Sequence, residues 1–157
     1  MQIIEYTDKY KQQVIELILH IQNDEAGIAL GIDEQPDLLD VDRFYLSSGG
    51  MFWLAVDGEQ LIGTIALMDK GSGGCVLKKF FFAKKYRSKG VGFALYKTFL
   101  AYAKEHGFEH VVLDTPSVAK ASHRFYEKAG FVRIDKTQLP FEYTYPDRAS
   151  LLYLLTM

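Results

Sequence analysis

The chain changes its strand connectivity part-way along, and this change constrains the fold more than any other feature of the sequence. Two apolar runs in residues 51–69 flank an Asp-Gly pair and predict a hairpin, because Asp-Gly is a favoured turn between antiparallel strands. Further on, an apolar strand at 75–83 leads through a basic loop into a helix at 90–107 and then into a strand at 110–115. A strand–helix–strand unit joins parallel strands, so the sheet must be mixed.

The remaining segments complete this plan. A pattern of apolar residues at helical spacing predicts an amphipathic helix at 8–24, and a looser pattern from Leu38 to Tyr45 predicts a second short helix. We expect an α/β (α+β) fold of order β-α-α-β-β-β-α-β-α-β-β, with helices on both faces of a mixed, mostly antiparallel sheet of six to seven strands. The other predicted elements are strands at 2–6, 131–134 and 150–157 and a helix at 117–129.

Composition sets limits on the class of protein. With 157 residues, 48% apolar and 24% charged, the chain is typical of a single globular domain spanning 1–157. It has no apolar run near the roughly 18 residues of a membrane span, and its first residues lack the layout of a signal peptide. Cys75 is the only cysteine, which is typical of a reducing compartment, so we expect a cytoplasmic protein. The four histidines form no H-x-x-x-H pattern, so we expect no metal.

The formal net charge of −2 conceals two segments of opposite sign. Segregated charges suggest two different ligands, although the solvated faces of a folded domain also produce charge runs. The acidic segment, 24–42, carries Asp24, Glu25, Asp33, Glu34, Asp37, Asp40 and Asp42. The basic segment, 78–89, carries Lys78, Lys79, Lys84, Lys85, Arg87 and Lys89.

The basic segment ends at a strand-to-helix joint, Arg87 to Gly92, that has the features of an anion site. The start of a helix presents unpaired backbone N–H groups and the positive end of the helix dipole. Glycines at 90 and 92 let an anion approach the backbone, and the basic side chains attract phosphate. The alternative interpretation is that the glycines serve helix–strand packing and the lysines solvation. The loop is neither a Walker loop nor G-x-G-x-x-G.

A second group of residues lies on the helix predicted at 117–129. Ser117 can cap this helix, and Tyr126 falls one position off its inner face, towards a helix edge. A tyrosine at such a position is either a core or boundary residue or a catalyst. In an open α/β sheet both crossover helices begin at the carboxyl ends of strands, where ligands bind. The predicted inner face comprises Val118, Ala121, Ser122 and Phe125.

Two motifs together carry a family resemblance. FFFAKKYRSKGVGFAL, residues 80–95, resembles the pyrophosphate loop of the GNAT superfamily of acyl-CoA N-acyltransferases, [QR]-x-x-G-x-[GA] after an apolar strand. ASHRFYEKAGF, residues 121–131, resembles that superfamily's second motif, a helix with an aromatic-Tyr pair that ends in Gly-Phe. The order of elements matches over essentially the whole chain. The resemblance implies a GNAT fold and an N-acetyltransferase that uses acetyl-CoA as cosubstrate.

The sequence departs from the GNAT pattern at several positions. Lys84 stands where Pro is common and Ser88 where Gly is common, and neither change removes a backbone donor of the loop. Ala119 replaces a frequent Asn, so a side-chain contact to the cofactor is missing. Many members carry a Glu on the strand before the loop, as a base acting through water, but residues 76–82 contain no carboxylate. The base is therefore unidentified.

The resemblance implies direct attack of a primary amine on the thioester, with both substrates bound together. It places the pyrophosphate on the backbone N–H groups of residues 88–92, with Arg87 and Lys89 nearby. The cofactor-binding residues that it implies are Phe80, Phe81, Phe82, Arg87, Ser88, Lys89, Gly90, Val91 and Gly92.

The resemblance also assigns the thioester end. The pantetheine arm pairs with the backbone of Phe80 and Phe82, in a splay between their strand and the strand at 110–115. A backbone N–H of Phe81 or Phe82 stabilises the oxyanion. Tyr126, with a reference pKa of about 10, supplies a proton to the CoA thiolate. His123 on the same helix either assists or is a surface or cofactor-flanking residue.

The acceptor pocket is implied to lie between residues 24–45 and the loop 139–149. Acidic residues in the first segment favour a cationic amine, small-molecule or peptide, unless they are merely exposed. Aromatic residues of the loop could add flat walls or a cation–π contact. The candidate base or amine anchors are Glu25, Asp33, Glu34 and Asp37, and the aromatic candidates are Phe141, Tyr143 and Tyr145.

Two other functions compete with this one. A nucleic-acid-binding module could use residues 78–89, but the sequence pI of about 6.1 argues against a broad phosphate-tracking surface. A GNAT-like acyl-CoA sensor without catalysis is compatible with the missing strand carboxylate. We expect no nucleic-acid or membrane partner. A homodimer is compatible with the family, the acyl group is acetyl or longer, and the class of amine stays open.

Overall fold

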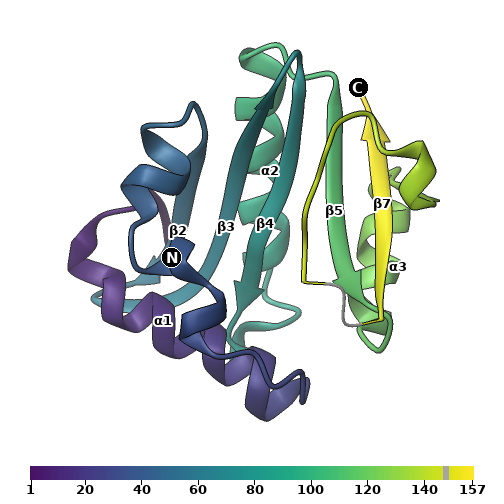
Figure 1. Ribbon diagram of the computed structural model, residues 1–157. Helices are drawn as coiled ribbons and strands as arrows, with labels where there is room; N and C mark the ends of the chain where they lie inside the picture. The colour runs from purple at the N-terminus through teal and green to yellow at the C-terminus, as the bar shows by residue number, and fades with distance from the viewer. Residues whose placement is uncertain (147–148) are drawn as a thin grey trace.

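The computed structural model describes residues 1–146 and 149–157, and within them the strands form a seven-stranded sheet of order β1-β2-β3-β4-β5-β7-β6 (Figure 1). Neighbouring strands are antiparallel except β4 and β5, which are parallel. The predicted mixed, mostly antiparallel sheet is therefore confirmed. The strands are β1 (Gln2–Glu5), β2 (Met51–Asp57), β3 (Gln60–Gly71), β4 (Gly74–Phe82), β5 (His110–Pro116), β6 (Val132–Ile134) and β7 (Ser150–Thr156).

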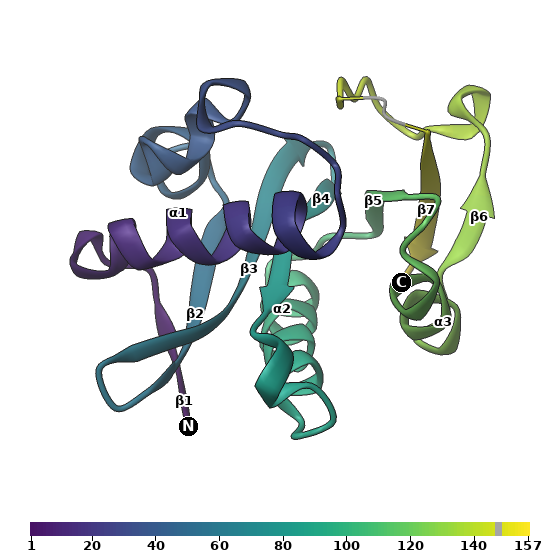
Figure 2. The same cartoon turned by 90° about the horizontal axis from the view of Figure 1, so that it is seen from below.

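Helices cover both faces of the sheet, as predicted. Figure 2 shows α1 on one face and α2 and α3 on the other. Helix α1 (Lys11–Leu19) continues as a wider helical segment, His20–Glu25. Helices α2 (Val91–Glu105) and α3 (Lys120–Lys128) are the crossovers that precede β5 and β6.

The second short helix, predicted from Leu38 to Tyr45, is present in part, because a wider helical segment spans Asp42–Leu46. The residues before it form two 3-10 helices, Ile32–Glu34 and Pro36–Leu38, instead of continuing the same helix. The apolar spacing still serves burial, since the side chains of Leu38 and Tyr45 are buried against α1 and β2. The helical spacing of apolar residues here arises because separate short helical segments share one buried face, and not because they form one continuous helix.

The two faces carry separate apolar cores because β2 and β3 are buried on both sides. On β2, Phe52 and Leu54 pack with Ile18 of α1, whereas Trp53 packs with Phe99 of α2. Successive side chains of a strand point to opposite faces, so a central strand that is covered twice reads as a continuous apolar run.

The parallel pair β4–β5 is short. Its pairing runs from Gly74–His110 to Val76–Val112, whereas both strands continue beyond it. The two ribbons diverge towards their carboxyl ends (Figure 1). Backbone groups of both strands therefore face each other across an open splay, as the sequence-based interpretation expected.

Among the described residues, no helix is long and apolar enough to cross a membrane. The same part of the chain holds no group of three or more His, Cys, Asp or Glu side chains placed to bind a metal ion.

Candidate active site

A cleft of about 850 Å³ lies where β4 and β5 separate. Its walls come from these two strands, the first half of α3, the segment around the end of α1, and the loop before α2. Among the residues predicted from sequence, those that line the cleft are Glu25, Phe80, Phe81, Phe82, Arg87, Ser88 and Tyr126. Those outside its lining are Asp33, Glu34, Asp37, Lys89, Gly90, Val91, Gly92 and the aromatic candidates Phe141, Tyr143 and Tyr145.

The loop before α2 presents free backbone N–H groups. Gly90 is the N-cap of α2, in the left-handed conformation with φ of 82°. Within residues 1–146 and 149–157, the N–H groups of Ser88, Gly90, Val91 and Gly92 have no protein acceptor. The N–H of Lys89 is different, because it donates to the carbonyl of Tyr86 at 3.2 Å. Four of the five predicted donors are thus available at the positive end of α2.

Gly92 is the point where α2 packs against β4. A Cβ at this position would lie 2.8 Å and 2.9 Å from two ring carbons of Phe82. At Gly90 a Cβ would meet nothing within 4 Å. Gly92 therefore serves helix–strand packing, the alternative interpretation of the motif, whereas Gly90 supplies a backbone conformation that few other residues adopt.

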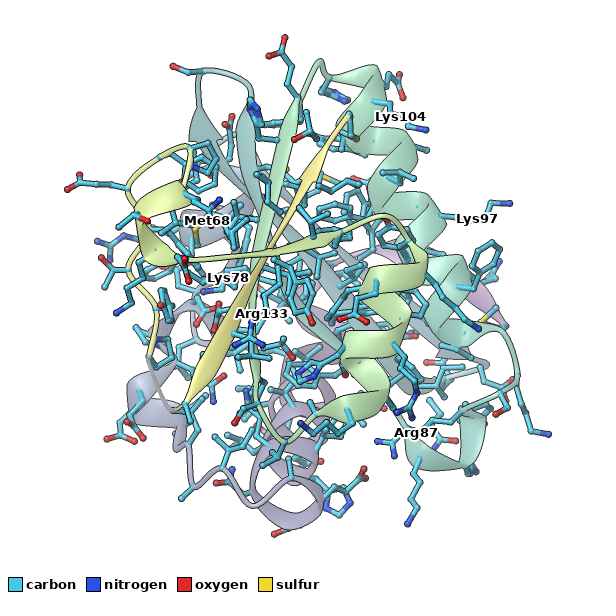
Figure 3. The ribbon with its side chains drawn as sticks, turned by 90° about the vertical axis from the view of Figure 1, so that its right-hand side faces the viewer. Met68, Lys78, Arg87, Lys97, Lys104 and Arg133 are labelled. Carbon is cyan, nitrogen blue, oxygen red and sulfur yellow. The ribbon has the colours of Figure 1, made fainter. Side chains whose placement is uncertain are left out.

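Arg87 forms an ion pair with Glu25 across one end of the cleft. The guanidinium Nη2 donates to Glu25 Oε1 at 2.6 Å, and the two side chains are 45% and 21% exposed. Figure 3 shows Arg87 beside the loop that precedes α2. An anion bound at this loop must compete with Glu25 for the guanidinium.

Helix α3 starts later than predicted, and its predicted inner face is right only in part, because Phe125 packs against the core whereas Ala121 is exposed. The N-cap is Ala119 and not Ser117, and Val118 is 67% exposed. A turn separates β5 from the helix, because the N–H of Ala119 donates to Pro116 O at 3.0 Å and that of Lys120 to Val118 O at 2.9 Å. The side chains most deeply buried on α3 are His123 and Tyr126, neither of which belongs to the predicted face.

Tyr126 and His123 are the buried polar side chains of α3, each 7% exposed. His123 Nε2 donates to Pro116 O at 2.9 Å, so His123 ties α3 to the end of β5, and its burial excludes the surface role, one of the alternatives left open by the sequence. Tyr126 lines the cleft, with its ring centroid 6.4 Å from that of Phe80. Burial, and then the charge of Asp114, raise the pKa of Tyr126 above its ordinary value, so the hydroxyl stays protonated at neutral pH.

A β-bulge turns Lys79 away from the core of α2 and α3. Thr64 pairs with Phe81 and Ala66 with Lys78, so β4 has one residue more than β3 between these pairs. Lys79 has a φ of 53°, and its carbonyl accepts a hydrogen bond from Thr64 Oγ1 at 2.6 Å. As a result the side chains of Lys78 and Lys79 lie on the same face, the face covered by α1.

Asp37 is part of a buried polar network with Lys79 and is not directed into the cleft. Tyr45 donates to Asp37 Oδ2 at 2.6 Å, and Lys79 Nζ lies 3.5 Å from the same oxygen. Lys79 Nζ also donates to Gln35 at 2.6 Å. Burial lowers the pKa of Lys79 to about 8 despite the attraction of Asp37. Among the other acidic candidates, the side chain of Glu34 accepts the N–H of Gly31 at 3.2 Å.

Comparison with known protein families identifies the family of this chain. Residues 15–131 match the acetyltransferase (GNAT) family, which is most of the chain. The chain belongs to the GNAT acetyltransferase family. The resemblance seen in the two motifs is thereby confirmed.

Several known proteins resemble the chain in structure or in sequence. An acetyltransferase structure from Streptococcus agalactiae is 37% identical with a TM-score of 0.95, covering 99% of this chain and 98% of that one. The PaiA N-acetyltransferase of Thermoplasma acidophilum, solved in complex with coenzyme A, is 17% identical with a TM-score of 0.78, covering 99% and 98%. The N-acetylaspartate synthetase of Danio rerio is 31% identical over 112 residues, which cover 70% of this chain and 39% of that protein. The chain thus spans less than half the length of this curated relative.

The sequence-based prediction missed one carboxylate of this GNAT cleft. Asp114 of β5 lines the cleft and accepts a hydrogen bond from the hydroxyl of Tyr143. Tyr143 lies in the predicted acceptor loop 139–149, of which residues 147 and 148 are outside the described residues. Its ring also lies 5.8 Å from Lys78 Nζ, so the expected cation–π contact is made with the protein's own lysine. The available signal was an aspartate in the otherwise apolar strand HVVLDT.

Proposed function

We propose that this GNAT protein transfers an acetyl group from acetyl-CoA to a primary amine, with both substrates bound in the cleft. The observation that carries the proposal is the splay of β4 and β5, which opens a cleft that reaches Ser88, the first of the free N–H groups at the start of α2. One end of this cleft suits a pyrophosphate, and its middle suits an extended peptide-like arm. Coenzyme A has both parts, joined in this order.

The residues present fit the cofactor in two respects. The loop 88–92, apart from Lys89, offers backbone donors at the start of a helix, where phosphate groups bind well. Beyond Val76, β4 has no partner strand on the β5 side, so the backbone of Phe80 and Phe82 can pair with pantetheine as with an added strand. Acetyl-CoA supplies the activated thioester.

The chain supplies the groups that act on the thioester. In our proposal a backbone N–H of Phe81 or Phe82 donates to the carbonyl oxygen as negative charge develops there. Tyr126 donates its proton to the sulfur as the C–S bond breaks. The raised pKa of Tyr126 supports this role, because the hydroxyl keeps its proton until a thiolate is formed. Phe80 packs beside Tyr126 and helps to exclude water from the reacting atoms.

The acceptor amine enters from the face that carries α1 and the segment 139–146. This side of the cleft is lined by apolar side chains such as Ile21 and Leu30, together with Gln22 and Glu25. Among the four acidic residues predicted from sequence, Glu25 is the one in the lining and stays our candidate for contact with the amine. A small molecule or a peptide terminus fits such a partly open cleft.

Titration calorimetry with acetyl-CoA, followed by a free-thiol assay over a panel of amines, tests this function. The panel contains polyamines, aminoglycosides, peptides and amino acids, with aspartate included because of the name of the Danio rerio relative. We expect saturable binding of acetyl-CoA and thiol release that depends on the acceptor. Binding without release for any amine indicates the non-catalytic sensor, and absence of binding refutes both.

A further inference from the structure

Lys78 and Asp114 are the first residues beyond the end of the β4–β5 pairing that point to the acceptor side. The last pair is Val76 with Val112, so Lys78 and Asp114 lie two residues further along each strand. The intervening residues, Leu77 and Leu113, belong to the core with α2 and α3. Because side chains alternate along a strand, Lys78 and Asp114 point to the opposite face. They therefore flank the mouth of the splay.

Tyr143 connects the two sides of this mouth. Its hydroxyl donates to Asp114 Oδ1, and its ring lies 5.8 Å from Lys78 Nζ. Tyr145 stacks on the Tyr143 ring with the centroids 5.4 Å apart, which limits the freedom of Tyr143. One oxygen of Asp114 is thus held by a neutral donor in a fixed orientation.

Asp114 differs from the other carboxylates near the cleft in forming no close ion pair, although its charge acts on Lys79 at longer range. Glu25, the other carboxylate of the lining, is paired with Arg87 at 2.6 Å. Asp37 lies outside the lining and is paired with Lys79. Asp114 forms no ion pair within 4.0 Å among the residues that the structure describes. Its charge is therefore available to a cationic ligand in the cleft.

Asp114 is also close enough to Tyr126 to act on it electrostatically. The pKa of Tyr126 is raised first by burial and second by the charge of Asp114. Tyr126 belongs to α3 on one face of the sheet, whereas Asp114 points to the other face. The charge of Asp114 therefore acts on Tyr126 across the splay between β4 and β5. In our proposed function the thioester lies in this splay.

We propose that Asp114 is the catalytic base that takes a proton from the ammonium group of the acceptor, with Tyr143 as its positioning residue. This inference rests on the proposed N-acetyltransferase function and supplies the base that β4 lacks. The contact of Tyr143 with Asp114, in a cleft whose other lining carboxylate is already paired, carries the assignment.

One N–H proton of the ammonium passes to Asp114, and the freed lone pair forms the C–N bond at the thioester carbonyl. The C–S bond breaks as Tyr126 protonates the sulfur. The nitrogen then loses its second surplus proton to the Tyr126 phenolate, and Asp114 releases its proton to solvent. The products are the amide, free CoA thiol and one proton.

Several titratable groups face Asp114 and can affect how the activity of the enzyme changes with pH. Lys78 and Lys79 lie on β4, Tyr143 on the β6–β7 connection, and Tyr126 on α3. On the other side, the register partner in β7 is the uncharged Leu152. The pKa of Tyr143 is raised by burial, so this donor stays protonated across the range of the assay. Lys79, with a pKa of about 8, titrates within that range, so variants are compared at equal pH.

Asp114→Asn tests the assignment, because an asparagine oxygen can still accept from Tyr143 but cannot take a proton. With an amine identified in the thiol assay, we expect kcat/KM at pH 7 to fall about 100-fold or more. The variant should recover about tenfold for each pH unit up to the pKa of the amine, since the acceptor then arrives deprotonated. Asp135→Asn, the same change at an exposed carboxylate outside the cleft, is the control and should match the wild type.

Calorimetry provides a readout besides activity. We expect Asp114→Asn to bind acetyl-CoA as the wild type does, but to bind the cationic acceptor about tenfold more weakly in the presence of CoA. Tyr143→Phe should lower kcat more than it raises KM, because the carboxylate remains but is no longer held. Asp114→Glu keeps a carboxylate, so its kcat/KM should vary with pH as the wild type does even if its kcat is lower.

Two results would overturn the assignment. One is an Asp114→Asn variant with wild-type kcat/KM at pH 7, and the other is a loss that is equally large at pH 7 and pH 9. A rising pH profile for Asp114→Glu counts against it as well. If the wild type itself neither binds acetyl-CoA nor releases thiol, the proposed function fails and this inference fails with it. An active wild type with an unaffected Asp114→Asn variant overturns only the role of Asp114.

Discussion

Gly92→Ala adds one methyl group at the contact between α2 and β4, and its effect can be worked from the structure. The new Cβ would lie 2.8 Å from Cε1 and 2.9 Å from Cζ of Phe82. Ordinary carbon contacts are about 3.5–4.0 Å, so the ring must retreat by about 1 Å. Overpacking of this kind costs about 1–3 kcal/mol of unfolding free energy. Phe82 also lines the cleft, so the displaced ring should weaken acetyl-CoA binding.

Phe82→Leu separates this clash from other effects of the substitution. Gly92 lies inside α2 without a positive φ, where alanine is intrinsically favoured by up to about 1 kcal/mol. Once the ring is gone, Gly92→Ala should therefore be neutral or stabilising. Gly90→Ala is the matched control, since its Cβ meets nothing within 4 Å while its φ is 82°. That change should cost about 1–2 kcal/mol from backbone strain alone, with or without Phe82.

Urea unfolding measures the change in unfolding free energy for the three single variants and the two double variants relative to the wild type. Calorimetry with acetyl-CoA measures the effect on cofactor binding. The reasoning is refuted if Gly92→Ala is as stable as the wild type. It is equally refuted if the cost of Gly92→Ala persists unchanged in the Phe82→Leu background.

Three further predictions concern side chains of the cleft. Tyr126→Phe should lower kcat about 100-fold or more while acetyl-CoA still binds in calorimetry, and wild-type turnover would remove Tyr126 from the mechanism. Glu25→Gln should tighten acetyl-CoA binding up to about fivefold at low salt by freeing Arg87, an effect that should fade at high salt. Lys79 has a folded pKa of about 8, below its ordinary 10.5, so the unfolded chain binds more protons between these values. The stability of the wild type relative to Lys79→Met should therefore rise by up to about 3 kcal/mol between pH 8 and 10.5. If the unfolding free energies of the wild type and Lys79→Met, measured in urea, change in parallel between pH 8 and 10.5, this prediction is contradicted.

The features that were predictable from sequence are local in the chain. The loop 88–92 and the motif around Tyr126 each lie within a few residues, and turn and helix signals fix their place between strands. The splay followed from the order of elements, because a parallel pair needs a crossover helix and the family places its cofactor there. Such features need no knowledge of which distant segments pack together.

The features that were missed depend on distant segments or on the exact start of an element. Tyr143 donates a hydrogen bond to Asp114, although it lies 29 residues further along the chain. No local sequence pattern in either segment predicts this contact. The start of α3 was misplaced because a turn after Pro116 delays it, and the prediction left the buried His123 and Tyr126 off the inner face. Acidic residues counted as candidates proved to be paired with Tyr45 and Lys79 or with backbone, which charge counting cannot foresee.

The bulge in β4 explains why a strand with two adjacent lysines can line this cleft. With regular alternation, Lys78 on the α1 face would place Lys79 among the apolar side chains of α2, where a charge has no partner. The extra residue restores the alternation one step later, so that Phe80 and Phe82 face the core of α2 and α3 while Phe81 packs on the α1 side. Both lysines are then on the acceptor side, where Asp37 and Gln35 receive Lys79. The same residue interrupts the pairing of β4 with β3 beside the splay from β5. Hence Lys79, in the left-handed conformation, has two effects. Its charge is placed beside Asp37 and not in the apolar core, and the bulge bends the strand on which the proposed cofactor arm lies.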